Sequence, residues 1–417
     1  MSNRPAFRYL LAAALAVGAC GAVDEGQSPA APGASTPPLA SAGPLSGGRA
    51  GDPMFDQRIL HDVRLVMDPQ DWQALRENFR ENQYYAADIT IDGERVQQVG
   101  IRSRGDGSRD PDKPGLKVDF NKNARTQEFH GYKTLVIDNI TQDASMIRER
   151  LAFAVYEAMG IPAPQIAHTR LTVNDEYWGV YALIEPVSKP FLKNRLGEES
   201  GNLFDYEYAY RWDFSFLGDD PEQYVPSPFE PQTNEDNLDP TDLIDFIRTA
   251  NEAPVEGFAA AMSKYLDVDA FLTYVAVENA LAERDGFVGE FGVNNFYLYQ
   301  YGRGSTRFVL IPWDKDTAFN HHEWPIAYNL NTNILTDKLT EDPGKMKVYR
   351  DAVVRTARTA VNIRFLGPLL DRAYAQIHDA VLEEDKKPYT NAAFEGDVAL
   401  LRQTIEMREG NILSQME

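Results

Sequence analysis

The sequence contains a single cysteine, Cys20, among 417 residues. A lone cysteine excludes an intramolecular disulfide and a thiolate metal cluster, so packing alone must hold the fold together. Basic residues are also scarce, because 41 Lys and Arg face 63 Asp and Glu, for a net charge of −22. Such an acidic surface excludes nucleic acid as a partner and repels anionic lipid, but it is compatible with divalent cations and basic proteins.

Long apolar runs are missing as well. The apolar stretch at residues 9–19 (YLLAAALAVGA) follows Arg4 and Arg8, and it is shorter than the roughly 20 residues that cross a bilayer. This pattern is typical of a secretory signal. Residues 17–20 (VGAC) resemble the bacterial lipobox, whose cysteine becomes lipidated. We therefore expect residues 1–20 to be a lipoprotein signal peptide, with lipidation at Cys20.

Residues 21–52 are rich in Pro, Ala, Gly and Ser, as in SPAAPGASTPPLASAGPLSGG. This composition cannot bury a core and predicts a disordered tether. The protein is then expected to be exported and anchored to a bacterial membrane, on the periplasmic side or at the cell surface. Its contact with the membrane would be through the lipid on Cys20 alone.

From residue 53 onward the periodicity predicts an α+β fold. A small, mainly antiparallel lobe is expected at 53–190, with hairpin turns at Asp92-Gly93 and Asn174-Asp175. Its expected strands are 59–66, 84–91, 95–104, 116–120, 133–138, 168–173 and 178–185, and its helices are 68–78 and 145–159.

The remainder, 191–417, is predicted to be mainly helical. A long acidic loop or lid is expected at 205–237, because this segment is acidic, aromatic and rich in proline. The helices expected beyond it include 240–251, 267–281, 345–359 and 400–415, and a strand pair is expected at 295–300 and 307–311.

Four stretches in the same order are similar to the CotH family of protein-kinase-like phosphotransferases. Residues 99–108 (VGIRSRGDGS) resemble a glycine-containing loop of that family, and residues 116–120 (LKVDF) resemble its lysine-bearing strand. Residues 176–185 (EYWGVYALIE) resemble its hairpin. The fourth stretch combines Asp285-Gly286 with NNFYLY at 294–299 and IPWDKD at 311–316. Together they cover about residues 53–415.

The resemblance implies an atypical protein-kinase-like bilobal fold, with an antiparallel-sheet N-lobe at 53–190 and a mainly helical C-lobe at 191–417. It implies ATP between the lobes, with Mg²⁺ or Mn²⁺, and phosphate transfer to Ser or Thr of an exported or cell-surface protein. Two alternatives stay open. One is a non-enzymatic surface adhesin or scaffold, and the other is a kinase-fold enzyme of different chemistry, such as nucleotidyl transfer.

Four residues of the fourth stretch are the candidates for catalysis and metal binding. Phosphoryl transfer needs a carboxylate at the acceptor hydroxyl and metal ions on the phosphates, and we expect Asp285 to supply the carboxylate. Asn295 and Asp314 offer hard oxygen ligands for Mg²⁺. Asp316 would face the same way if its segment is extended. Taken singly, each residue is better explained as an ordinary cap or turn, and it is the combination that favours a site.

The phosphate side of the site is expected in the smaller lobe. Lys117 is the predicted phosphate-binding lysine, with Lys113 as its competitor. The preceding loop, with Gly105 and Gly107, can present backbone N–H groups to phosphate, and Arg104 can add a positive charge. The loop is not a Walker motif and lacks a full G-x-G-x-x-G.

Other residues have weaker claims. Glu149 is placed to pair with Lys117, as kinases require, and Glu185 ends a strand where kinases have the hinge, although a buried cap explains Glu185 equally well. Arg102 can face phosphate or pair with an acid. Arg284 stands directly before Asp285, and residues 288–293 look inserted relative to the family, so the choice of acceptor and the activity itself stay open.

Overall fold

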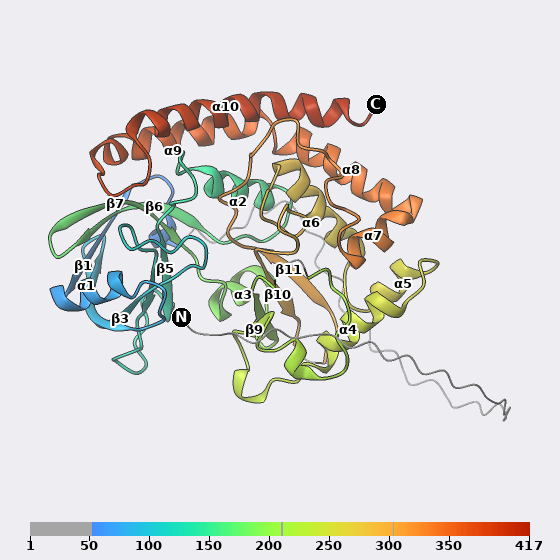
Figure 1. Cartoon of the computed structure of the whole chain (residues 1–417), viewed down its shortest axis with the longest axis horizontal. Coiled ribbons are helices and arrows are strands. Elements are labelled where there is room, and N and C mark those ends of the chain that lie inside the picture. The colour runs from blue at the N-terminus through green and yellow to red at the C-terminus, as the bar shows by residue number, and fades with distance from the viewer. Residues whose placement is uncertain (1–51, 210–211, 303) are drawn as a thin grey trace, which may run out of the picture. The chain divides into compact units, whose positions relative to one another are not determined.

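The computed structural model describes residues 52–209, 212–302 and 304–417. The predicted signal peptide, the lipidation site Cys20 and nearly all of the predicted tether lie outside these residues. Within them the chain is a mixture of strands and helices (Figure 1), which confirms the expected α+β class. Every helix in the described part of the chain is too short or too polar to span a membrane.

Seven strands close into a barrel in the order β1-β2-β3-β4-β5-β7-β6. Neighbouring strands pair antiparallel except β1 and β6, which run parallel. The expected antiparallel sheet of the smaller lobe therefore curls until its first strand meets β6. The strands are β1 (His61–Met67), β2 (Tyr85–Ile91), β3 (Glu94–Ser103), β4 (Leu116–Asp119), β5 (Thr134–Asp138), β6 (Ile166–Val173) and β7 (Glu176–Ile184).

The barrel follows from local sequence. Alternate residues of β1 point inward and are buried, as the alternating pattern predicts. The predicted turns are present, with positive φ at Asp92, Gly93, Asn174 and Asp175. Residues of this type tolerate the left-handed conformation that tight hairpins need. The expected hairpins are thereby confirmed.

A second sheet has the order β11-β10-β8-β9, with all neighbours antiparallel. The predicted strand pair at 295–300 and 307–311 is confirmed as β10 and β11. The prediction that 205–237 is one long loop is wrong in part, because β8 reaches Tyr206 and Phe229 begins β9. Both side chains are buried and their rings contact each other at 5.6 Å, so aromatic burial makes this stretch part of the sheet. The strands are β8 (Asn202–Tyr206), β9 (Phe229–Pro231), β10 (Phe296–Gln300) and β11 (Phe308–Pro312).

Helices surround α6, which is buried along nearly its whole length. The long helices α9 and α10 lie side by side, and α9 also contacts β7 of the barrel (Figure 1). The helices are α1 (Pro69–Glu77), α2 (Arg148–Ala158), α3 (Lys189–Leu196), α4 (Thr241–Glu252), α5 (Phe258–Met262), α6 (Val268–Leu281), α7 (Ile334–Glu341), α8 (Pro343–Thr359), α9 (Ile363–Glu383) and α10 (Asn391–Ser414); short 3-10 turns are η1 (Pro53–Phe55), η2 (Pro221–Gln223) and η3 (Glu235–Asn237).

Helix α10 begins nine residues before its expected start at Leu400. Its first turn carries small exposed residues that weaken the apolar periodicity, so the start was not visible from the pattern. Thr390 provides the real signal, because its side chain accepts the N–H of Ala393 at 3.1 Å and caps the helix.

Candidate active site

Acidic side chains from three separate parts of the chain meet beside the second sheet. Asp138 ends β5, Glu149 lies in the first turn of α2, and Asp314 follows β11. Glu149 Oε1 accepts the backbone N–H of Lys315 at 3.3 Å, which attaches the segment after β11 to α2. Asp314 has a φ of 51°, so the chain turns sharply there. We name Asp138, Glu149, Asp314 and Asp316 the acidic cluster.

The acidic cluster carries surplus negative charge. Burial, followed by the charge of Asp138, raises the pKa of Asp314 to about 6. Burial and the neighbouring carboxylate of Asp314 raise the pKa of Glu149 and of Asp316 well above the ordinary range. Carboxylates that disfavour one another's charge in this way are typical of sites that receive a cation.

Arg104 is the barrel cation that faces the acidic cluster. Its guanidinium pairs with Asp138 and lies 5.8 Å from the ring centroid of Trp313. Burial opposes its charge, but Asp138 and Asp314 outweigh that effect and raise the Arg104 pKa. The backbone N–H of Arg104 donates to the carbonyl of Gly115 at 2.9 Å, which fixes the residue at the edge of the glycine-containing loop.

Asp285 and Asn295 are joined directly. The Asn295 amide donates to the Asp285 carbonyl at 2.8 Å, and the Asn294 amide donates to Asp285 Oδ1 at 2.9 Å. The Asn295 carbonyl accepts the N–H of Trp313 at 3.3 Å, and the Asp285 carboxylate contributes to raising the Asp314 pKa. The structure thus brings together three residues that the sequence singled out, namely Asp285, Asn295 and Asp314.

The condition set for Asp316 is not met, because its segment is not extended. Asp314 is left-handed and residues 316–319 form a turn. Asp316 nevertheless stays close enough to Asp314 and Glu149 for their charges to raise its pKa. Its neighbours also include Asp143, which lies before α2 and accepts the backbone N–H of Arg148 at 2.8 Å.

Lys117 lies on β4, opposite Arg102 of β3. Burial and the positive charge of Arg102 lower its pKa, while Asp205 and Glu230 of the second sheet oppose that shift. We name Arg102, Arg104 and Lys117 the cationic edge of the barrel. The predicted pair of Lys117 with Glu149 is not formed, because Glu149 bonds to the segment after β11 instead.

Asp205 was missed by sequence reasoning, which placed it in a loop. It lies on β8, opposite Tyr297 of β10. Burial raises its pKa to about 7, in spite of the favourable charges of Arg104 and Lys117. Phe204 and Tyr206 are buried on either side of Asp205. This alternation of apolar and acidic residues is the sequence signal that indicates a strand rather than a loop.

Lys113 lies in a separate environment, where its charge is paired. Its ammonium lies 2.6 Å from Glu384 Oε1, with both side chains buried, and donates to the carbonyl of Val180 at 2.9 Å. Burial lowers its pKa even so. Lys113 therefore ties the loop before β4 to the residue after α9, whereas Lys117 is the lysine whose pKa the charge of Arg104 helps to lower.

The loop between β3 and β4 is held by hydrogen bonds to its backbone carbonyl groups. Gly105 has a φ of 103°, and a Cβ there would lie 2.5 Å from Ser108 Oγ. Arg109 donates to the Gly105 carbonyl at 2.6 Å, and Asn139 donates to the Ser108 carbonyl at 2.9 Å. Gly107, by contrast, has open space around its Cβ position.

Glu185 belongs to a different network. It is buried just after β7, where it accepts the hydroxyl of Tyr132 at 2.9 Å and the N–H of Gln165 at 3.0 Å. Arg195 lies 3.7 Å away. Its partners in the described ranges come from the barrel and α3 rather than from the acidic cluster.

The oxygen donors fit a hard divalent cation that arrives with phosphate. No group of three or more His, Cys, Asp and Glu side chains in the described part of the chain is arranged to hold a metal ion. Mg²⁺, however, is usually held by one or two carboxylates together with substrate phosphates and water, rather than by a complete protein cage. Asp314 and the side-chain oxygen of Asn295 meet that requirement, with Asp316 as a further carboxylate.

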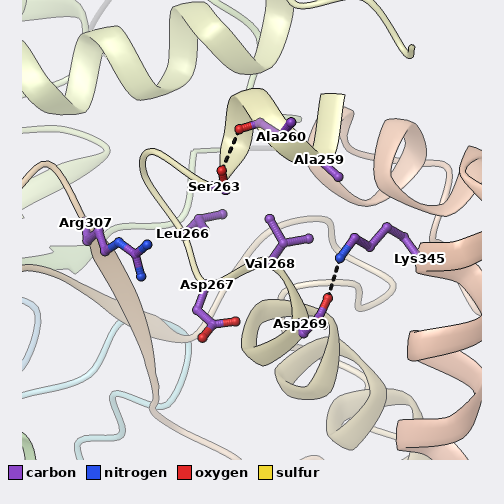
Figure 2. A pocket seen from close by; sticks show the side chains of 9 residues that line it. All are labelled: Ala259, Ala260, Ser263, Leu266, Asp267, Val268, Asp269, Arg307 and Lys345. Atoms are coloured by element: carbon purple, nitrogen blue, oxygen red, sulfur yellow. Dashed lines mark hydrogen bonds and ion pairs between the residues drawn. The ribbon is translucent and has the colours of Figure 1, made fainter. Parts of the chain in front are cut away.

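A hollow of about 400 Å³ lies elsewhere, between α5, the start of α6 and α8 (Figure 2). Lys345 and Asp269 pair across it at 2.6 Å. Asp267 caps α6 by accepting the N–H of Ala270 at 3.0 Å. Asp267, Asp269 and Lys345 already have structural partners, and the hollow contains none of the predicted site residues.

Comparison with known proteins gives the family. The profile described as "CotH kinase protein" matches residues 101–412, well over half of the chain. The chain is similar to inner spore coat protein H of Bacillus subtilis, with 24% identity over 85% of this chain and 97% of the relative. It is also similar to two proteins of Rhizopus delemar, spore coat protein homolog 1 and invasin CotH7. Each is 21% identical, and the matches cover 80% and 79% of this chain but only 56% and 57% of the relatives. The chain therefore belongs to the CotH family.

Proposed function

We propose that the chain is a metal-dependent phosphotransferase that moves phosphate from ATP to Ser or Thr of an exported protein. The observation that supports this most is the meeting of Arg104, Asp285, Asn295 and Asp314 where the barrel adjoins the second sheet. A cation from one region faces acidic and amide oxygens from the other. A bilobal, protein-kinase-like arrangement with ATP between the barrel and the helical region accounts for this pairing.

In this proposal each side chain has one role. The cationic edge, with Arg104 and Lys117, binds phosphate oxygens, as do backbone N–H groups of the loop with Gly105 and Gly107. Asp314 and Asn295 hold Mg²⁺ or Mn²⁺, which neutralises charge on the phosphates when bound. The acidic cluster gains most from such a cation, because its carboxylates disfavour each other's charge.

The transfer itself needs one proton acceptor. The acceptor hydroxyl oxygen attacks the γ-phosphorus, and the bond from that phosphorus to the bridging oxygen breaks, so that ADP leaves. The hydroxyl proton passes to the Asp285 carboxylate. Asn294 holds Asp285 Oδ1 at 2.9 Å, which leaves the second carboxylate oxygen for this proton.

Transfer of radiolabelled phosphate from ATP with Mn²⁺ to exported proteins tests the proposal. The wild type should label an acceptor, whereas Asp285→Ala and Asp314→Ala should label it at least about 100-fold less. Asp269→Ala is the matched control, because Asp269 is exposed and pairs with Lys345 at the hollow of Figure 2. Equal label in all four proteins would refute the assignment. The mass added to the acceptor distinguishes phosphate from a transferred nucleotide.

A second candidate is a non-enzymatic surface module. It is favoured by one observation, that a relative of similar identity is named an invasin. Thermal unfolding with ATP and Mn²⁺ separates the two, because a ligand at 100 times its dissociation constant stabilises the fold by about 2.7 kcal/mol. A chain that acts only as an adhesin should show no such gain.

The proposed location is the bacterial envelope, with the lipid on Cys20 as the anchor. The basis is the sequence of residues 1–20 alone. Metabolic labelling with a radioactive fatty acid should label the wild type and not Cys20→Ser. Label that persists in Cys20→Ser would contradict this anchor.

A further inference from the structure

Glu283 and Thr317 connect the loop that carries Asp285 to the segment that carries Asp314. Glu283 lies two residues before Asp285, and its side chain is 1% exposed. Its Oε1 accepts the backbone N–H of Asp285 at 2.9 Å and also accepts the hydroxyl of Thr317. The Thr317 oxygen in turn lies 3.2 Å from the same N–H. The three residues form a closed triangle between two separate stretches of the chain.

The opposite side of the same loop is fixed independently by Glu278 of α6. Glu278 Oε2 accepts the N–H of Val288 at 3.2 Å, and Lys315 donates to its Oε1 at 3.0 Å. A Cβ on Gly286 would lie 2.7 Å from Glu278 Oε2, so the loop packs directly on this carboxylate. Two carboxylates therefore hold the loop, Glu278 on one side and Glu283 on the other.

The Glu283 carboxylate is costly to the folded state. Its Oε2 is buried with no hydrogen-bond partner among the residues that the structure describes. Burial raises its pKa to about 7, although the positive charge of Lys315 opposes the shift. An uncharged side chain would avoid the cost of burying a charge. Buried polar atoms are also normally hydrogen-bonded, and Oε2 is not. Its presence is therefore better explained by what it holds, which is the backbone of Asp285.

We propose that Glu283 and Thr317 are positioning residues, which set the place of the Asp285 carboxylate relative to the Asp314 segment. This inference rests on the proposed phosphotransfer. Neither side chain needs to touch ATP or the acceptor. A displacement of about 1 Å of a reacting group costs up to about 100-fold in rate, so the triangle controls kcat rather than substrate binding.

Three variants test the inference through the separation of kcat from KM. Thr317→Val removes the hydroxyl at nearly constant volume, and kcat should fall about 10- to 100-fold while KM for ATP stays within about twofold. Thr317→Ser keeps the hydroxyl and should retain most of the rate. Thr306→Val is the matched control, since that hydroxyl donates to the Lys264 carbonyl outside the site. The melting temperature of each variant shows whether it is folded.

Glu283→Gln supplies a second, independent route. Glu283 and Thr317 both bond to the N–H of Asp285. The double variant Glu283→Gln with Thr317→Val should therefore have a kcat only slightly below that of the slower single variant. The inference would be overturned if the double variant lost the product of the two single losses in kcat. It would also be overturned if Thr317→Ser were as slow as Thr317→Val, or if KM changed while kcat did not. In each of these cases the wild type would still be active. A wild type that transfers no phosphate would overturn the proposed function and this inference together.

Discussion

Buried charge is neutralised in one region of the molecule and left unbalanced in another. Lys113, in the loop before β4, pairs with Glu384, directly after α9, at 2.6 Å, and both side chains are fully buried. In the acidic cluster, by contrast, Asp138, Asp314 and Glu149 share the cation Arg104, and burial with neighbouring carboxylates raises the pKa of Glu149, Asp314 and Asp316. The first region behaves as a structural core and the second does not.

The unbalanced charges lie where the proposed ligand would bind. The buried pair already has its counter-charge, whereas the acidic cluster has more carboxylates than Arg104 neutralises, and Lys117 of the cationic edge forms no ion pair within the residues that the structure describes. A polyphosphate that carries a divalent cation supplies both charges at once. The imbalance is therefore better physical evidence for the proposed site than the presence of any single acidic residue.

The largest expected effect tests the balanced region. Lys113→Met should lower the free energy of unfolding by about 3–5 kcal/mol, because it leaves the Glu384 carboxylate buried without its partner. Chemical denaturation at neutral pH measures the loss. Lys113→Met combined with Glu384→Gln should recover part of it, since the unpaired charge is gone. A loss of unfolding free energy below about 1 kcal/mol would mean that the ion pair of Lys113 with Glu384 does not stabilise the fold.

The next effect tests the unbalanced region. Asp314→Asn should reduce phosphate transfer about 100-fold, because a neutral amide oxygen binds Mg²⁺ more weakly than the charged carboxylate it replaces. The same change should raise the melting temperature of the ligand-free protein at pH 8. The pKa of Asp314 is raised to about 6, so its charge opposes folding above that pH. Reduced activity with reduced stability would instead indicate a structural carboxylate.

A smaller effect separates the two lysines. Lys117→Met should weaken binding of ATP with Mn²⁺ about 10-fold, which is about 1.4 kcal/mol, and should change unfolding by less than about 1 kcal/mol. Burial and Arg102 already lower the pKa of this lysine, so its removal costs the fold little. Isothermal titration measures the affinity. Unchanged binding would assign the phosphate contact to Arg104 alone.

Much of the fold was predictable because it depends on local signals. The two hairpins follow from Asp92-Gly93 and Asn174-Asp175, whose residues accept positive φ. The strand pair β10–β11 follows from its apolar runs. The pairing of β8 with β9 was not predictable, because their contact joins residues separated by a proline-rich segment and depends on burial of Tyr206 and Phe229.

The types and the order of the site residues could be predicted from the sequence, but the groups that each side chain contacts could not. Asp285, Asn295 and Asp314 were expected together and the structure brings them together. Glu149 was paired with Lys117 in the prediction, yet it accepts the N–H of Lys315. Such a pairing depends on how α2 packs against the segment after β11, a long-range contact that no local pattern encodes.

The smallest effect concerns Asp205, the acidic residue of the second sheet that faces the cationic edge. Burial raises its pKa from 3.8 to about 7, so the folded chain binds this proton more tightly than the unfolded chain does. Stability from this group is therefore present below pH 4 and is lost as pH rises towards 7. Because Asp205 is only half-buried, the free energy of unfolding should change by about 1 kcal/mol in total over this pH range. Unfolding free energies at pH 5.5 and pH 7.5 should differ less in Asp205→Asn than in the wild type, whereas Asp269→Asn, at an exposed pair, should match the wild type. An unaltered pH dependence in Asp205→Asn would mean that Lys117 and Arg104 keep the carboxylate ionised, and that the cationic edge is already balanced from within.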